Sequence, residues 1–158
     1  MVNKGIGGDV VEGLASRWTT DIIEENPDWV SIAIGINNVA RASMTNQKLE
    51  DALNRFRDNY QEIISRTREE TNARLILLEI FYVAEEDKLH RNYNITPYNE
   101  VIHELAEDFG SILVPVSSAF RKAAIERPDI EWTTGDGVHP TAVGHTLIAL
   151  SLLETLNW

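Results

Sequence analysis

Short apolar runs alternate along this sequence with segments of helical periodicity, and this alternation most limits the possible folds. The runs at 30–35, 74–81 and 112–115 are nearly continuous and rich in valine, isoleucine and leucine. Such runs are typical of strands buried on both faces of a sheet. Strands separated by helices indicate βαβ crossovers. We therefore predict an α/β fold with a parallel sheet covered on both faces.

The segments between the runs carry helical signals. The apolar positions of 49–64 are spaced by three and four and lie on one face of a long helix: Leu49, Leu53, Phe56, Tyr60, Ile63 and Ile64. Further helices are expected over 10–25, 97–109, 117–126 and 140–156, while the polar stretch 37–48 indicates a loop. Gly110 fits a helix stop, and Ser117 or Ser118 fits an N-cap. The last helix has an expected apolar face of Val143, Leu147, Leu150 and Leu153.

Length and charge exclude several classes of protein. The 158 residues suit one domain, and 14 basic against 25 acidic residues give a net charge of −11. Nucleic-acid or anionic-membrane binding is not expected, because phosphate contacts need clustered Lys and Arg. Without cysteine, disulfides and thiolate sites are excluded. The best apolar run, 75–83, is short and contains Glu79, and the N-terminus has no signal-peptide core. We expect a cytoplasmic protein.

Reactive groups in parallel sheets lie at the carboxyl ends of strands, and one such loop holds Asp136 and His139. An Asp three residues before a His can place its carboxylate on the imidazole Nδ1. The Nε2 atom is then free to accept a proton from a nucleophile. The alternative is an ordinary turn beside a helix N-terminus.

Two other places carry candidate oxyanion donors. Asn37 follows the run at 30–35, where its amide N–H could meet a developing negative charge. The glycines of segment 3–9 would let a backbone N–H approach a ligand closely. That segment fits neither a Walker A loop nor a dinucleotide fingerprint. Simple turns are the alternative at both places.

Taken together, the motifs N-x-G-x-x-G-D at 3–9, G-x-N-N at 35–38 and D-G-V-H-P at 136–140 resemble those of the SGNH (GDSL) hydrolase family. The resemblance spans nearly the whole chain and is closest to the acetyl-xylan esterase branch, through 2–6, 27–32, 34–37 and 139–145. It implies oxyanion donors at Gly8 and Asn37, with Asp136 and His139 as catalytic acid and base.

The resemblance also implies a fold and an activity. The fold would be a three-layer α/β/α sandwich with a flavodoxin-like parallel sheet. The activity would be hydrolysis of a small ester, such as deacetylation of a sugar or xylo-oligosaccharide, without a cofactor. The alternative is a non-catalytic binding or assembly protein that keeps the pocket.

The sequence departs from the family pattern in two ways. Asn38 stands where the family usually has Asp. The family's Gly-Asp-Ser block, which bears the nucleophile on the first strand, should precede Asn3 and is not found. We expect one SGNH-like domain over 1–158, N-terminally incomplete and inactive alone. Truncation, a mis-called start and a pseudoenzyme all fit this expectation. Without the first strand, the run at 30–35 becomes a sheet edge, which favours a homo-oligomer.

The chain's own serines are poor nucleophile candidates, because none lies on a Gly-flanked turn between a strand and a helix. Only Ser43 and Ser117 are expected in loops that could face the site. The other candidates are expected within or beside helices and strands: Ser16, Ser31, Ser65 and Ser118.

Other residues have weaker functional signals. Trp132 could line a sugar pocket or pack in the core. Glu85, Glu86 and Asp87 are expected to form a solvated acidic loop. The remaining histidines show no metal-ligand spacing, so no metal is expected.

Overall fold

The computed structural model describes residues 1–45 and 47–158. Its helices and strands, in chain order, are α1 (Val11–Trp18), a π-helical turn (Thr19–Ile23), β1 (Trp29–Ile32), α2 (Ile36–Met44), α3 (Leu49–Glu70), β2 (Arg74–Leu78), a 3₁₀ turn (Ala84–Glu86), α4 (Thr96–Asp108), β3 (Ile112–Val114), α5 (Val116–Glu126) and α6 (Ala142–Thr155). The strands overlap the predicted apolar runs, and α3 matches the predicted long helix.

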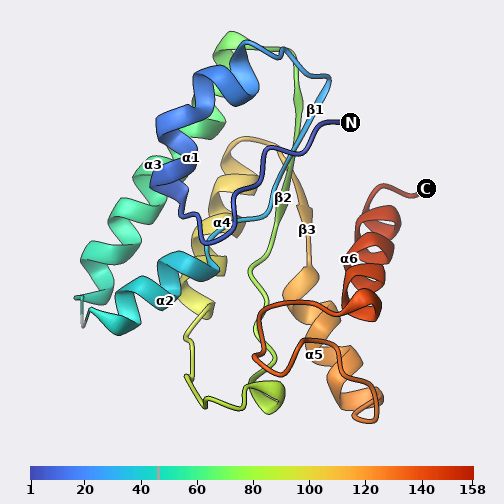
Figure 1. Ribbon diagram of the computed structural model, residues 1–158. Coiled ribbons are helices and arrows are strands. Elements are labelled where there is room, and N and C mark those ends of the chain that lie inside the picture. The colour runs from blue at the N-terminus through green and yellow to red at the C-terminus, as the bar shows by residue number, and fades with distance from the viewer. Residues whose placement is uncertain (46) are drawn as a thin grey trace.

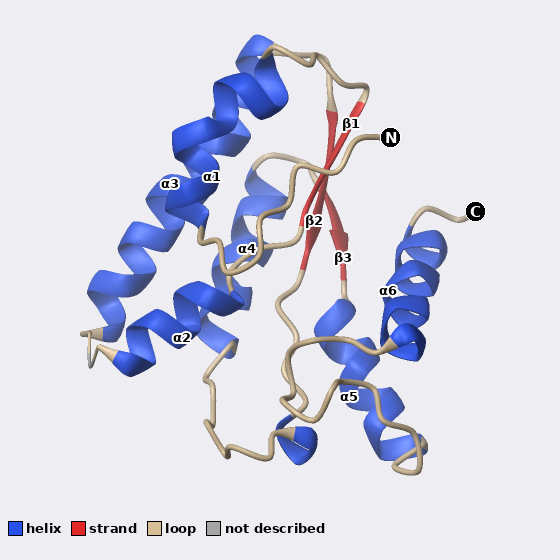
Figure 2. Cartoon of the chain, in the orientation of Figure 1, coloured by secondary structure: helices blue, strands red, loops and turns tan. Residues whose placement is uncertain are grey.

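The strands form a parallel sheet in the order β1-β2-β3, as the alternation of runs and helices predicts (Figure 2). The register pairs Val30 with Leu75 and Leu77 with Leu113. The central strand, β2, is buried from Leu75 to Leu78. Because successive side chains alternate across a strand, β2 supplies apolar groups to both faces of the sheet.

Helices cover the two faces, which gives the three-layer α/β/α sandwich (Figure 1). On one face, α1, α3 and α4 pack on Leu75 and Leu77 in a cluster that includes Phe56 and Tyr60. On the other face, α5 and α6 pack on Ile76 and Leu78. The predicted fold class is therefore confirmed.

β1 is the edge of the described sheet, and only one of its faces is buried. Val30 and Ile32 join the core, whereas Trp29 is 44% exposed and Ser31 also faces solvent. The prediction of burial on both faces is wrong for this strand, because the cluster under α5 and α6 contains no β1 residue. The Arg74 guanidinium lies 4.4 Å from the centre of the exposed Trp29 ring.

The predicted loop at 37–48 is wrong over most of its described length, since α2 occupies Ile36–Met44. Gly35, with a φ of 127°, turns the chain out of β1, and the Val39 N–H donates to the Gly35 carbonyl. A side chain at Gly35 would meet Ile80 at 2.5 Å. Asn37 and Asn38 form the first helical turn, which explains why they resemble turn residues in the sequence.

The predicted apolar face of α6 is wrong at three of its four positions, since Val143, Leu150 and Leu153 are exposed. Leu147 packs against the core as predicted, and the helix adds the buried Gly144 and Ser151 to this face. A Cβ on Gly144 would lie 2.3 Å from the Trp132 carbonyl oxygen, so this close approach needs a small residue. Apolar residues occupy most sides of α6, and hydrophobic spacing alone could not select the buried one.

Neither predicted serine caps α5. Pro115 occupies the N-cap position, and the Glu79 carboxylate accepts the Ser117 N–H at 2.9 Å. Gly110, with a φ of 55°, follows α4 as the predicted stop. No helix in the part of the chain that the structure describes is long and apolar enough to cross a membrane.

Candidate active site

The loop before α6 brings Asp136 and His139 into direct contact. Asp136 Oδ2 lies 2.5 Å from His139 Nδ1, which is the contact that the D-x-x-H spacing predicts. The other oxygen, Oδ1, accepts the backbone N–H groups of Val138 at 3.1 Å and His139 at 2.9 Å. The imidazole side chain is 76% exposed, and no described group hydrogen-bonds its Nε2.

The charge of Asp136 determines the state of this pair. Partial burial acts to raise the pKa of the carboxyl, but hydrogen bonds from the His139 and Val138 groups outweigh it and lower the pKa. Asp136 is therefore ionised at neutral pH and can only accept a hydrogen bond. Neutral His139 consequently carries its proton on Nδ1, and the lone pair on Nε2 is available as a base.

Glycines give the loop its shape. Gly135 and Gly137 have φ angles of 83° and 73°, which favour glycine. A Cβ on Gly137 would lie 2.7 Å from the Val83 carbonyl oxygen and 2.8 Å from the Tyr82 ring. The loop is closed by a bond from the Thr134 N–H to the His139 carbonyl at 2.9 Å. Its backbone therefore has little room for another conformation.

The segment between β2 and α4 forms hydrogen bonds that fix the loop of Asp136 and His139. Glu86 accepts the N–H of Trp132 at 2.8 Å, and both the N–H and the hydroxyl of Thr133 at 2.5 Å. The Val83 N–H donates to the Gly137 carbonyl at 2.9 Å. Asp87 is only 1% exposed. The prediction of a solvated acidic loop at 85–87 is therefore wrong for Glu86 and Asp87, because both carboxylates bind protein groups.

On the other side of the candidate site, Asn37 joins the glycine-rich segment. Its Nδ2 donates to the Asp9 carbonyl at 2.9 Å. Its neighbour Asn38 accepts the Val11 N–H at 3.1 Å and donates to Glu12 at 2.8 Å. An Asp at position 38 could accept but not donate, so the departure at Asn38 supplies the bond to Glu12.

Gly8 lies in the exposed turn of this segment. It has a φ of 80°, and a Cβ placed on it would meet nothing within 4 Å. The Arg17 guanidinium binds this segment on both sides of Gly8. It donates to the Asp9 carboxylate at 2.7 Å and to the Lys4 carbonyl at 2.8 Å. The structure thus ties Asn37 to the segment that carries Gly8. The Gly8 N–H has no partner among the described groups.

Both halves lie at the end of the sheet where β1 and β2 end (Figure 1). Asn37 follows β1, and the segment that holds the Asp136 loop follows β2. Among the described residues, no hydrogen bond joins Gly8 or Asn37 to Asp136 or His139. A hollow between α3 and α4, lined by Leu53, Arg57 and other residues, contains none of these groups.

The serines lie in other places. Ser43 belongs to α2 rather than to the predicted loop, and Ser117 lies in the first turn of α5. The hydroxyls of Ser16 and Ser118 donate to the carbonyls of Gly13 and Pro115. In residues 1–45 and 47–158, no hydrogen bond joins a serine hydroxyl to His139.

Trp132 packs beneath the loop. It is 8% exposed, belongs to the core cluster with Phe120 and Val116, and donates its indole N–H to the Arg127 carbonyl at 3.2 Å. Its burial favours the packing interpretation over a role as a pocket wall.

The histidines outside the acid–base loop are not expected to bind a metal ion. Of these, His103 hydrogen-bonds Glu79 at 2.6 Å. No group of three or more potential ligands that could hold a metal ion occurs among the described residues.

Comparison with known proteins places this geometry in a family. A model of the GDSL-like lipase/acylhydrolase family matches residues 1–147. The chain is 32% identical over 165 residues to an acetylxylan esterase of Geobacillus stearothermophilus, an alignment that covers 100% of this chain and 72% of that protein.

Solved structures agree with this placement. A structure of Axe2, an acetylxylan esterase from Geobacillus stearothermophilus, matches with a TM-score of 0.81 and 30% identity, over 99% of this chain and 72% of that chain. A GDSL-like protein from Parabacteroides merdae matches with a TM-score of 0.87 and 28% identity, over 98% of this chain and 72% of that chain. Axe2 structures described as catalytic mutants change a serine near its N-terminus, an aspartate, or a histidine three positions after that aspartate.

Proposed function

Because the chain belongs to the GDSL-like lipase/acylhydrolase family, we propose that it carries the acid–base and oxyanion parts of a carboxylic ester hydrolase. The single observation that carries the proposal is the Asp136 carboxylate on Nδ1 of an exposed His139. The same spacing of three separates the aspartate and the histidine changed in the Axe2 catalytic mutants.

The proposed chemistry follows from the atoms. His139 Nε2 takes the proton of a serine hydroxyl as that oxygen attacks the ester carbonyl, and returns it to the leaving alcohol. Asp136 keeps the proton of neutral His139 on Nδ1 and stabilises the imidazolium that forms. A water molecule then releases the acid by the same route. No cofactor is required by these steps.

The developing oxyanion needs N–H donors. The Gly8 N–H is unused among the described groups, and its turn is open to solvent. The Asn37 amide has two N–H groups, one of which donates to the Asp9 carbonyl. The second remains for a ligand. A donor of this kind contributes about 3 kcal/mol to transition-state stabilisation.

We further propose that the nucleophile is not one of the described serines. Three of their hydroxyls, those of Ser16, Ser118 and Ser151, already donate to nearby backbone carbonyls, and no described serine hydroxyl bonds His139. A Gly-Asp-Ser strand paired with the open edge of β1 is the expected source, in agreement with the N-terminal position of the serine changed in Axe2.

The proposed substrates are acetylated sugars or xylo-oligosaccharides, or other small esters. This choice is supported by the acetylxylan esterase relative and by the structural match to Axe2. The same proposal includes a homo-oligomer, which the open edge of β1 supports. It also includes a cytoplasmic location, which the cysteine-free sequence supports. No nucleic-acid or membrane partner is proposed for so acidic a chain.

The test uses the 158-residue chain and a chimera in which a Gly-Asp-Ser strand and helix from a GDSL relative precede Asn3. Acetylated xylobiose and p-nitrophenyl acetate are the substrates. We expect the chimera to release acetate and the chain alone to show no phosphonate-sensitive release. The matched controls are His139→Ala, expected to abolish the chimera's activity, and His90→Ala, an exposed histidine expected to preserve it.

Three results would contradict the proposal or part of it. Phosphonate-sensitive turnover by the chain alone would show that one of its own serines is the nucleophile. A folded chimera, with a cooperative thermal transition and native circular dichroism, that released no acetate would contradict the esterase function. If the chimera does not fold, the proposal is tested by titrating the 158-residue chain with acetylated xylobiose and following the NMR signals of the His139 ring. The proposal predicts saturable binding, and its absence would count against the function.

A further inference from the structure

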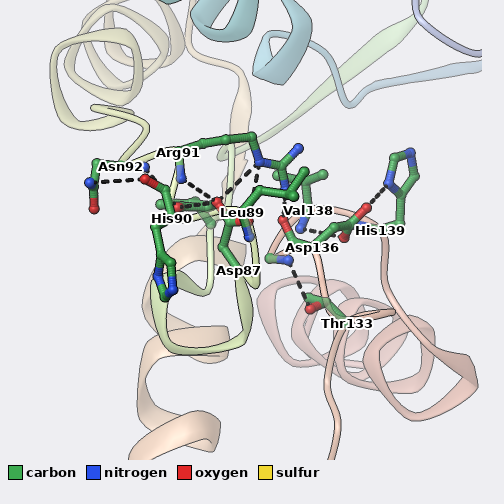
Figure 3. Close-up of polar contacts among 11 residues, drawn as sticks. Asp87, Leu89, His90, Arg91, Asn92, Thr133, Asp136, Val138 and His139 are labelled. Carbon is green, nitrogen blue, oxygen red and sulfur yellow. Dashed lines mark hydrogen bonds and ion pairs between the residues drawn. The ribbon is translucent and has the colours of Figure 1, made fainter.

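The Asp87 carboxylate is buried beside the acid–base loop and is fully engaged (Figure 3). It accepts the Tyr82 hydroxyl at 2.7 Å and the N–H groups of Leu89 and Arg91, each at 2.9 Å. The Arg91 Nε adds bonds of 3.2 and 3.1 Å to its two oxygens. Such a set of donors fixes both the position and the orientation of a carboxylate.

Arg91 links this carboxylate to the acid–base loop. Its Nε faces Asp87, while its Nη2 donates to the backbone carbonyl of Asp136. Figure 3 shows the guanidinium reaching across from the Asp87 segment to Asp136. The planar guanidinium presents its donors at fixed angles, so that the two contacts set the distance between the two segments.

The charges in this link are stable at neutral pH. The hydrogen bond from Arg91 is the main cause that holds the pKa of Asp87 well below its usual range, against the effect of burial. The Asp87 bond likewise raises the pKa of Arg91. The guanidinium carbon of Arg91 also lies 5.1 Å from the centre of the Tyr93 ring, within the range of a cation–π contact. Asp87 and Arg91 therefore form an ionised pair, and Arg91 of this pair binds the Asp136 backbone carbonyl.

The position of the Asp136 backbone determines what its side chain can do. Asp136 Oδ1 is already bonded to two N–H groups of the same loop, so the carboxylate moves with that backbone. Rotation of the Asp136 peptide would carry Oδ2 away from His139 Nδ1. We propose that Asp87 and Arg91 are positioning residues that hold Asp136 where it can orient His139.

This inference rests on the proposed function for its catalytic meaning, but its geometric content can be tested without turnover. The readout is the tautomer of His139, followed by ¹⁵N chemical shifts in the intact 158-residue chain. We expect neutral wild-type His139 to carry its proton on Nδ1. Loss of the orienting carboxylate would allow the Nε2–H tautomer to form.

The principal variants are Asp87→Asn, which removes charge at nearly constant shape, and Arg91→Lys, which keeps charge but removes the fork. We expect each to lower the Nδ1–H fraction of His139 about twofold or more. Tyr82→Phe removes one bond to Asp87 and is expected to act in the same direction but less. In the chimera, each change should lower kcat more than it changes KM.

The matched controls come from α3, where Arg66 and Glu70 form an ion pair with the same spacing of four, at 2.8 Å. Glu70→Gln and Arg66→Lys should leave the His139 tautomer unchanged. A folded Asp87→Asn or Arg91→Lys chain with the wild-type tautomer ratio would overturn the proposal.

If both principal variants fail to fold, Tyr82→Phe decides the question: an unchanged tautomer ratio in that folded variant overturns the proposal. An inactive chimera with the expected tautomer shifts would instead contradict the esterase function and leave the positioning role intact.

Discussion

The two halves of the candidate site are held in different ways. The acid–base loop at 132–140 is joined to the segment after β2 through Glu86, Val83 and Arg91. The glycine-rich segment at 3–9 is joined to the rest through Asn37 and Arg17, while Gly8 itself stands in open space. This chain therefore holds the Asp136–His139 contact through several segments, whereas the proposed oxyanion donor at Gly8 has no described atom within 4 Å of a Cβ built on it.

Gly137 and Gly8, two of the glycines with positive φ, give the sharpest test of this difference. Gly137→Ala should destabilise the chain by about 3 kcal/mol, because a positive φ and a clash with the Val83 carbonyl act together. Gly8→Ala should cost only about 1 kcal/mol, because its φ is similar but its surroundings are empty. Urea unfolding of both variants measures the two values. Equal losses would contradict the contrast.

Removing the Glu86 carboxylate should have the next largest effect. Glu86→Ala leaves the buried N–H groups of Trp132 and Thr133 without an acceptor, and we expect a loss of about 2 kcal/mol in the free energy of unfolding. Glu85→Ala, an exposed neighbour, is the control and should change stability little. Comparable losses in the two variants would show that Glu86 does not support the loop.

On the oxyanion side, Asn37→Ala removes the bond to the Asp9 carbonyl. The expected loss of stability is about 1 kcal/mol, since one hydrogen bond of a part-buried group disappears. In the active chimera, the same change should lower kcat about a hundredfold or more, because a donor to the oxyanion is also lost. A large loss of stability with unchanged kcat would reverse the assignment of Asn37.

The last effect appears only in acid, as the carboxyls of Asp87 and Asp136 become protonated. Hydrogen bonds lower both pKa values in the folded chain, so the folded state binds fewer protons than the unfolded state in acid. Their contribution to stability is fully present above the ordinary Asp pKa of about 4 and is lost as the pH falls through the folded values. Unfolding free energies measured from pH 7 to pH 2 should follow this course. Asp87→Asn should weaken the dependence below pH 4.

The sequence predicts the central parts of the fold well. The continuous apolar run of β2 and the three–four spacing of α3 each indicate one structure, and both elements form. The contact between Asp136 and His139 could also be predicted, because the two residues are local and the motif repeats a known spacing. These predictions succeed where the relevant information lies within a few residues.

The rest depends on contacts between distant segments. Glu86 and Asp87 resemble any exposed acidic turn, because their partners Thr133 and Arg91 are recognisable only in the folded chain. One local signal was present: Asp87 and Arg91 are four residues apart, the spacing of a helical ion pair, in a segment with little helix. Likewise, α6 is apolar on most sides, and only packing selects Gly144 and Ser151.

The central claim is that hydrogen bonds fix the loop of Asp136 and His139, whereas the turn at Gly8 is exposed to solvent. Amide hydrogen exchange in the 158-residue chain tests it most directly. The N–H groups of Gly137 and His139, bonded to Thr133 and Asp136, should exchange much more slowly than the N–H of Gly8. Equal protection of the Gly8 N–H, or rapid exchange at Gly137 and His139, would contradict the account.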